Sequence, residues 1–219
     1  MSETSSSLPR TFWLGTATAF GLLGLAVMLA TLQNVRQQKS ALPVLGRVAD
    51  FTLTNQDGKI TTLADLTNHV WIADIIFTRC AGPCPRMTMQ MASLQNALSS
   101  ANQAKLVTLT TDPDHDSPEL LKRYGEHYGA IFDRWSFLTG SKEEIAGLAA
   151  DSLKLGATPI KPEDRQNSAD LFIHTTIFVA VDKHAQLRGV FESGGDGVDW
   201  TNVVQPQLLR TIRRLENEP

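Results

Sequence analysis

The chain has 219 residues, of which 42% are hydrophobic and 20% are charged, as is usual for a globular protein. Its formal net charge of -3 lacks the basic excess that is typical of nucleic-acid-binding domains, and we expect no nucleic acid among its partners. After a distinct amino-terminal segment, about 180 residues remain, which is enough for one domain with its own hydrophobic core.

The amino-terminal segment contains a long stretch without charge. Residues 12–32 follow a tail of residues 1–11, and a helix of this length spans the hydrocarbon core of a bilayer. A cleaved signal peptide is the alternative, but its apolar core would be shorter and Arg10 would be its only basic residue. We therefore predict an uncleaved transmembrane anchor and then a polar tether over residues 33–45. More positive charges follow the anchor than precede it, and this count by itself favours a cytoplasmic position for the next domain.

The rest of the chain alternates between β-like and helix-like patterns. The predicted strands are residues 48–53, 70–78, 105–111, 134–139, 171–181 and 186–191, and residues 60–66 are a short strand and turn. The predicted helices are residues 85–100, 117–128, 141–153 and 199–215. A hairpin turn over residues 55–59 joins the first two strands, and Ser117 is expected to cap the second helix. The spacing from Ser141 to Glu144 predicts a capping box, and residues 155–170 predict an exposed polar loop. Strands that alternate with helices, followed by a hairpin and a helix, predict an α/β fold.

Both cysteines of the chain, Cys80 and Cys84, lie where a buried strand leads into a helix. The first turn of a helix carries unpaired N–H groups and a partial positive charge, which predicts a lowered thiol pKa. Pro85 suits that first turn. Gly82 and Pro83 interrupt the helix, so the two sulfurs can approach each other or one metal ion. A strand, a cysteine turn and a helix are the thioredoxin-like arrangement, here with a CxxxC spacing.

A structural disulfide is the simplest alternative for Cys80 and Cys84, but a loop of three residues would remove little chain entropy. We therefore favour a redox pair or a metal site. His174 opens a predicted strand whose start would lie beside the cysteine turn in a thioredoxin-like sheet. Two cysteines and one imidazole suit copper, whereas zinc would need a fourth ligand. The residues alone leave His174 open between a ligand and an ordinary core or edge histidine. The other histidines are expected to be solvated: His69, His115, His127 and His184.

Two further groups have both a functional and a structural interpretation. Met87, Met89 and Met91 could form a copper-binding cluster, but Met89 points away from the other two on a helix, which favours core packing. Asp112 and Asp116 flank a loop that contains proline. They could act as an acid/base pair, a site for a hard metal or a docking surface, but a solvated loop with helix capping is the interpretation that we favour.

Four motifs, taken in order, resemble those of the Sco/SenC family, the copper chaperones of cytochrome c oxidase assembly. They are FTxCxxxCP over residues 77–85, DPxxDTPE with its helix over residues 112–124, FLTG over residues 137–140 and HT at residues 174–175. The resemblance runs from about residue 46 to 215, so residues 46–219 are expected to form the thioredoxin-like Sco/SenC domain. This chain departs from the family pattern at Ala81, where proline is frequent, and at Ser117, where threonine is usual. The first change puts the geometry of the turn in question.

The resemblance implies that Cys80, Cys84 and His174 bind a copper ion, and that the partner is the copper-site subunit of cytochrome c oxidase or another copper or thiol protein. It also implies a single-pass protein of the cell inner membrane with its carboxyl-terminal domain on the periplasmic side, which overrides the charge count. The alternative function is a thiol–disulfide oxidoreductase, in which Cys80 and Cys84 are the catalytic redox pair and no copper is carried. A peroxidase is the weaker third alternative.

Overall fold

The computed structural model describes residues 22–29, 42–98, 102–155, 157–159, 172–174, 176–195 and 197–218. The chain divides into two compact units, residues 1–42 and 43–219. In the first unit residues 22–29 are helical, and most of the anchor predicted over residues 12–32 lies outside the described part. None of the helices within the described ranges has both the length and the apolar composition that a bilayer span requires.

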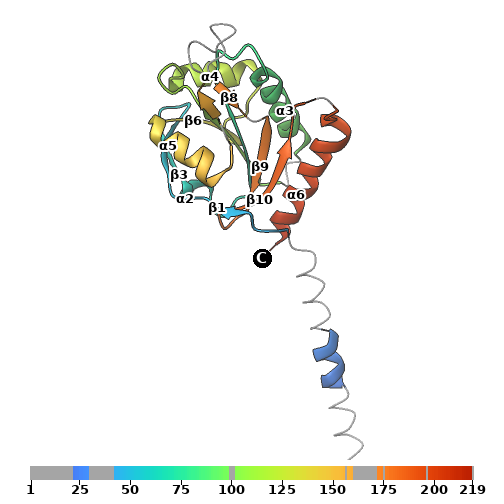
Figure 1. The fold of residues 1–219 in the computed structure, drawn as a ribbon. Helices are drawn as coiled ribbons and strands as arrows, with labels where there is room; N and C mark the ends of the chain where they lie inside the picture. Colours follow the sequence, from blue (N-terminus) through green and yellow to red (C-terminus); the bar gives the residue numbers. More distant parts are fainter. Residues whose placement is uncertain are drawn as a thin grey trace, which may run out of the picture. The chain divides into compact units, whose positions relative to one another are not determined.

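The second unit is built on an eight-stranded sheet in the order β1-β10-β9-β4-β5-β6-β2-β3 (Figure 1). The strands are β1 (Gly46–Arg47), β2 (Thr52–Asn55), β3 (Ile60–Thr62), β4 (Trp71–Ile76), β5 (Lys105–Thr110), β6 (Trp135–Thr139), β9 (Ile177–Val181) and β10 (Gln186–Glu192). The central strands β4, β5 and β6 are parallel, and β9 pairs antiparallel with β4. A separate two-stranded sheet pairs β7 (Ala157–Pro159) with β8 (Phe172–His174).

Helices cover both faces of this sheet, which is why all six residues of β4 are buried. The helical elements are α2 (Leu63–Leu66), α3 (Cys84–Ala97), α4 (Pro118–His127), α5 (Lys142–Ala146), α6 (Gln205–Asn217) and the π-helical turns η1 (Gly147–Ser152) and η3 (Trp200–Val204). Trp71, Ala73 and Ile75 of β4 share one core with α2, α5 and η1. On the opposite face, Ile76 packs against the start of α3, and α3 lies beside α6 (Figure 1).

The predicted helix starts at Ser117 and Ser141 are confirmed, but the Glu144 side chain has a hydrogen-bond partner that was not predicted. The Ser117 hydroxyl accepts a hydrogen bond from the Leu120 amide at the start of α4, as expected for an N-cap. The Ser141 hydroxyl likewise accepts from the Glu144 amide. The Glu144 carboxylate, however, accepts from the Thr52 amide at 2.6 Å instead of returning to Ser141. Only half of the predicted capping box therefore forms, because the first residue of β2 offers the carboxylate another donor.

Four predicted segments differ from the structure. The strand and turn predicted over residues 60–66 is β3 only as far as Thr62, and residues 63–66 form the helix α2. The strand predicted over residues 171–181 is two strands, β8 and β9, which belong to different sheets. Leu155 is fully buried although the pattern predicts an exposed loop from residue 155 on, and most of that loop lies outside the described residues. The strand predicted over residues 48–53 begins only at Thr52, because Val48 and Phe51 pack in the core without pairing in the sheet.

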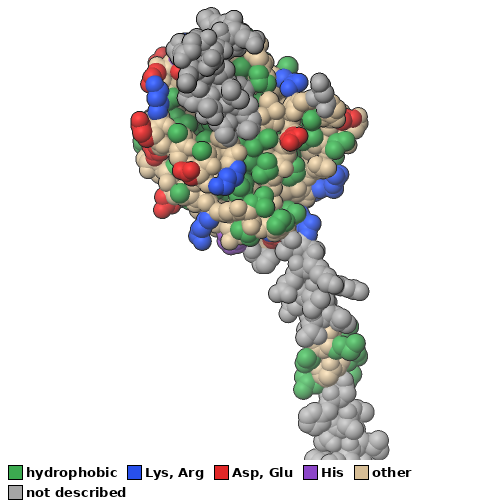
Figure 2. Space-filling model, viewed as in Figure 1, with side chains coloured by type: hydrophobic (Ala, Val, Ile, Leu, Met, Phe, Trp, Pro, Cys, Tyr) green, Lys and Arg blue, Asp and Glu red, His purple; other side chains and the backbone are tan. Residues whose placement is uncertain are grey.

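The face of the molecule in Figure 2 carries Lys and Arg side chains interspersed with Asp and Glu side chains and uncharged surface. Hydrophobic side chains are visible there singly and in small groups. Such scattered apolar residues are normal on a folded protein and mark no particular site.

Candidate functional site

The two cysteines lie at the junction between β4 and α3. After β4 ends at Ile76, the Cys80 amide donates a hydrogen bond of 3.2 Å to the Phe77 carbonyl and closes a turn. Helix α3 then begins at Cys84, with Pro85 in its first turn. Neither cysteine is in a disulfide and both are buried, with exposed fractions of 9% for Cys80 and 0% for Cys84. The predicted strand, turn and helix are confirmed.

The surroundings of Cys84 raise the pKa of its thiol. The largest cause is a hydrogen bond with the Cys80 thiol, followed by burial, which disfavours the charged thiolate. A backbone hydrogen bond from Phe77 lowers the pKa, and the charge of the nearby Asp74 raises it. The prediction of a lowered pKa at the helix start is therefore wrong for Cys84. The partial charge of a helix terminus is outweighed by a second thiol and by the loss of water.

Asp116 lies beneath the cysteine turn and is fully buried. Its Oδ1 accepts hydrogen bonds from the Thr78 hydroxyl at 2.5 Å and from His115 Nδ1 at 3.1 Å. Its Oδ2 accepts from the Thr78 amide at 3.1 Å and from the Thr110 hydroxyl at 2.5 Å. The carboxylate thus joins the end of β5 to a residue that stands two positions before Cys80.

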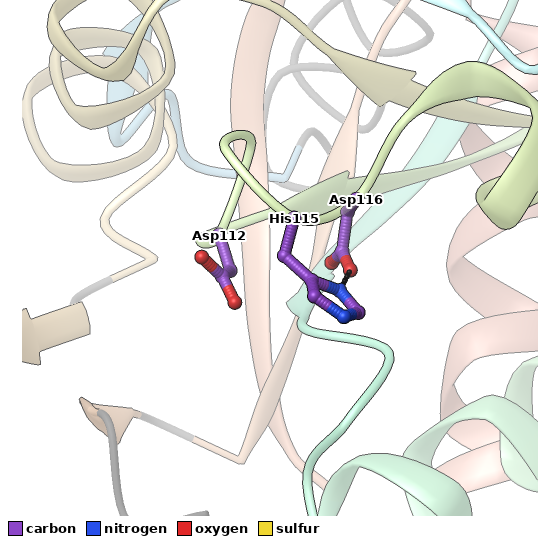
Figure 3. A group of neighbouring side chains, drawn as sticks. All are labelled: Asp112, His115 and Asp116. Carbon is purple, nitrogen blue, oxygen red and sulfur yellow. Dashed lines mark hydrogen bonds and ion pairs between the residues drawn. The ribbon is translucent and has the colours of Figure 1, made fainter.

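Asp112, His115 and Asp116 offer ligand atoms that lie within 4.8 Å of one another (Figure 3). Three of the four carboxylate oxygens already have partners, however. Asp112 Oδ2 pairs with both Nε of Arg79, at 2.8 Å, and its terminal nitrogen, at 2.7 Å. The two oxygens of Asp116 accept four hydrogen bonds between them. Asp112 is only 7% exposed, so the expectation of a solvated loop is wrong for both aspartates, and their contacts favour a structural role over a hard-metal site.

Helix α4 supports the second cysteine through a tyrosine. The Thr88 hydroxyl donates to the Cys84 carbonyl at 2.9 Å and lies 2.9 Å from the Tyr124 hydroxyl. Tyr124 also packs against the cluster formed by both cysteines, Ile76 and Phe77. Burial raises the pKa of Tyr124, so the phenol stays protonated and can donate this hydrogen bond.

A further titratable group, Asp74, was not singled out by the sequence patterns. It lies on β4, is 1% exposed, and is the one acidic residue in an otherwise apolar strand. Burial raises its pKa to about 7, against the lowering effect of a hydrogen bond from Thr108. An acidic residue inside a continuous apolar run is a signal that could have identified it.

The other predicted site residues fall in different places. His174 is the last residue of β8, where its backbone pairs with Ala157; its side chain lies outside the described part. The remaining histidines are partly or fully exposed, although His115 also bonds to Asp116. Met87 and Met91 are fully buried and Met89 is 55% exposed, which confirms core packing over a methionine cluster.

A sheet of this topology, with two adjacent thiols where a central strand leads into a helix, defines a thioredoxin-like protein with a dithiol site. Over residues 43–207 the chain matches the model of the SCO1/SenC family, and it belongs to that family. It is 40% identical to the SCO1 protein homolog of Bacillus subtilis over 141 residues, which are 64% of this chain and 70% of that protein. It is 29% identical to a SCO2-like protein of Rickettsia felis over 116 residues, 52% of this chain and 55% of that protein.

Solved structures agree with this assignment. BsSco, a member of the Sco family of cytochrome c oxidase assembly proteins in which a disulfide switch was identified, superposes with a TM-score of 0.66 at 30% identity. That alignment covers 82% of this chain and 100% of BsSco. Bradyrhizobium japonicum ScoI with copper bound gives a TM-score of 0.62 at 19% identity, with coverage of 77% and 99%. The second likeness establishes the fold alone.

Proposed function

We propose that this protein is a membrane-anchored copper-binding chaperone for assembly of the binuclear copper site of cytochrome c oxidase. The observation that carries the proposal is the pair of adjacent thiols, Cys80 and Cys84, in a chain of the SCO1/SenC family. Copper is the cargo of such a protein and passes to the partner by exchange of ligands. The partner would be the copper-site subunit of the oxidase or another copper or thiol protein.

The ligands in this proposal are the sulfurs of Cys80 and Cys84 and the imidazole of His174. Two hydrogen-bonded thiols are near enough to share one ion, and thiolates with an imidazole suit copper. The β4–β9 pairing supports a role for His174. Because β9 runs antiparallel to β4, the start of β9, three residues after His174, lies at the end of the sheet where β4 leads into the cysteine turn. Copper must displace the thiol protons, so binding should strengthen as pH rises.

The test is copper binding by the full chain in detergent, reduced and kept anaerobic. We expect about one copper per chain, as a single site of this ligand set would hold, and loss of tight binding in Cys80→Ser, Cys84→Ser and His174→Ala. His184→Ala is the matched control, because His184 lies exposed in a turn, and it should bind copper as the unchanged protein does. Failure of the unchanged protein to bind copper tightly would refute the chaperone proposal.

A thiol–disulfide oxidoreductase that acts without copper is the second candidate. It is favoured by the direct hydrogen bond between the two thiols, which places Cys84 where it can resolve a mixed disulfide formed by Cys80. BsSco, which has a disulfide switch, is a 30% identical structural neighbour. Reduction of a partner disulfide that survives His174→Ala, together with absence of copper binding, would select this function.

We also propose the anchor over residues 12–32, the tether over residues 33–45 and the periplasmic domain over residues 46–219, in a single-pass protein of the cell inner membrane. The uncharged length of the anchor segment supports this arrangement. The full chain should stay in the membrane fraction under alkaline extraction, and a chain that begins at Pro43 should not. Alkaline phosphatase fused after Pro219 should be active if the carboxyl-terminal domain is periplasmic. An inactive, stably produced fusion would reverse the orientation.

A further inference from the structure

The segment between β4 and α3, residues 77–83, belongs neither to the sheet nor to a helix. Regular pairing of β4 with β5 ends at Ile76. Beyond it the Cys80 amide donates a hydrogen bond to the Phe77 carbonyl, and the Gly82 amide donates to the Cys80 sulfur at 3.3 Å. Further support comes from the loop between β5 and α4. The Thr111 amide donates to the Ile76 carbonyl at 2.8 Å. Asp116 and Asp112 of the same loop bind Thr78 and Arg79, the next residues of the turn.

Asp116 makes the strongest of these contacts. It receives both the amide and the hydroxyl of Thr78, one on each oxygen, so it fixes the backbone and the side chain of that residue together. The Thr110 hydroxyl and His115 occupy the remaining acceptor positions. Because Asp116 is fully buried, no water can replace a lost donor without rearrangement.

The neighbouring contact, between Asp112 and Arg79, is weaker although Arg79 directly precedes Cys80. The Arg79 side chain is 47% exposed, so solvent screens this ion pair. One loop thus holds the turn by two contacts of different strength: the buried Asp116–Thr78 contact is the stronger, and the half-exposed Asp112–Arg79 contact is the weaker.

We propose that Asp116 is a positioning residue for the dithiol: through Thr78 it holds Cys80 at hydrogen-bond distance from Cys84, in the geometry of the reduced pair. This inference rests on the proposed function only in taking Cys80 and Cys84 as the reactive pair. A disulfide requires the two sulfurs to approach to about 2.05 Å, closer than any hydrogen bond between them, so the turn must move on oxidation. Holding the turn therefore favours the dithiol over the disulfide.

The test compares Thr78→Val with Thr78→Ser in the full chain in detergent. Valine keeps the shape but removes the hydroxyl that Asp116 accepts, whereas serine keeps the hydroxyl. The readouts are the dithiol–disulfide equilibrium constant of the pair against glutathione and the rate of iodoacetamide alkylation. We expect Thr78→Val to shift the equilibrium about tenfold towards the disulfide and to speed alkylation by a similar factor, which is the size of one hydrogen bond to a charged group. Thr78→Ser should match the unchanged protein.

Three further variants complete the design. Asp116→Asn should act in the same direction as Thr78→Val, Asp112→Asn should have a smaller effect, and Asp114→Asn, at an exposed position of the same loop, should have none. Leu215→Ala, in the buried face of α6, controls for general loss of stability. Equal behaviour of Thr78→Val and Thr78→Ser would overturn the proposal, and so would an equal equilibrium shift in Leu215→Ala.

Copper binding, measured on the same samples, separates this inference from the proposed function. If the unchanged protein binds no copper but Thr78→Val shifts the thiol equilibrium, the chaperone proposal fails and the positioning role stands. If copper binds and the equilibrium is the same in all variants, the positioning role fails and the chaperone proposal stands.

Discussion

The Asp74 carboxyl group accepts a 2.6 Å hydrogen bond from the Thr108 hydroxyl on the neighbouring strand, and its second oxygen has no hydrogen-bond partner in the described structure. The same hydroxyl accepts from the Trp135 indole at 2.9 Å. These hydrogen bonds connect β4, β5 and β6. They lie on the same face of the sheet as Ile76, which packs against the start of α3. It places a buried acid electrostatically close to Cys84.

Asp74 should make the stability of the protein fall as pH rises. Its pKa is about 7 in the folded protein, against an ordinary value of 3.8. Between these values the unfolded chain releases a proton that the folded protein retains, so the unfolded state gains stability. The loss levels off above pH 7 and amounts to roughly 4 kcal/mol.

Asp74→Asn should remove that loss. Its free energy of unfolding relative to the unchanged protein should increase between pH 4 and pH 8, as measured by urea denaturation at a series of pH values. Asp50→Asn, at an exposed position, is the control. Parallel pH profiles for Asp74→Asn and the unchanged protein would contradict the raised pKa.

Thr108→Val should destabilise the domain by about 2–4 kcal/mol, because it leaves the buried Asp74 carboxyl and the Trp135 N–H without their shared partner. It should also raise the pKa of Asp74 further, since the Thr108 hydrogen bond lowers that pKa. Denaturant titration measures the first effect and its pH dependence the second. Thr108→Ser keeps the hydroxyl and should cost much less; an equal cost for both variants would assign the effect to packing.

Cys80 should react with iodoacetamide before Cys84. Cys84 has no exposed surface and a raised pKa, so it offers little thiolate, whereas Cys80 is 9% exposed. Mass spectrometry of the reduced protein at pH 8 should find the first label on Cys80. In single-thiol variants, Cys84→Ser should be labelled about tenfold faster than Cys80→Ser. Equal labelling rates of the two single-thiol variants would contradict the prediction, because they would show that both thiols are equally accessible to the reagent.

Arg188 should be important for stability. It is 7% exposed and forms ion pairs with Asp182 at 2.5 Å and with Glu218 near the carboxyl terminus at 2.7 Å. Arg188→Met leaves Asp182 buried without its cation and should cost about 3 kcal/mol in thermal or urea unfolding. Arg210→Met, on the exposed face of α6, should change stability by less than about 0.5 kcal/mol. If Arg188→Met lowered the free energy of unfolding no more than Arg210→Met does, the prediction would be contradicted.

Local patterns were sufficient for the parts of the fold that depend on neighbours in the chain. The apolar run before Cys80 predicted β4, Pro85 marked the start of α3, and Ser117 marked the start of α4. The four ordered motifs were sufficient for the family. These features follow from side-chain periodicity and from the backbone preferences of proline and serine, which act within a few residues.

Tertiary structure decided how the charged and polar groups behave. Asp116 is buried because the turn before Cys80 folds onto its loop. Glu144 bonds to Thr52 because the start of β2, which is distant in the sequence, lies within reach. The direction of the Cys84 pKa shift likewise depends on a second thiol and on exclusion of water, both properties of the packed protein. Burial and long-range donors set the energy of a charged group, and neither can be inferred from the residues adjacent to it in the chain.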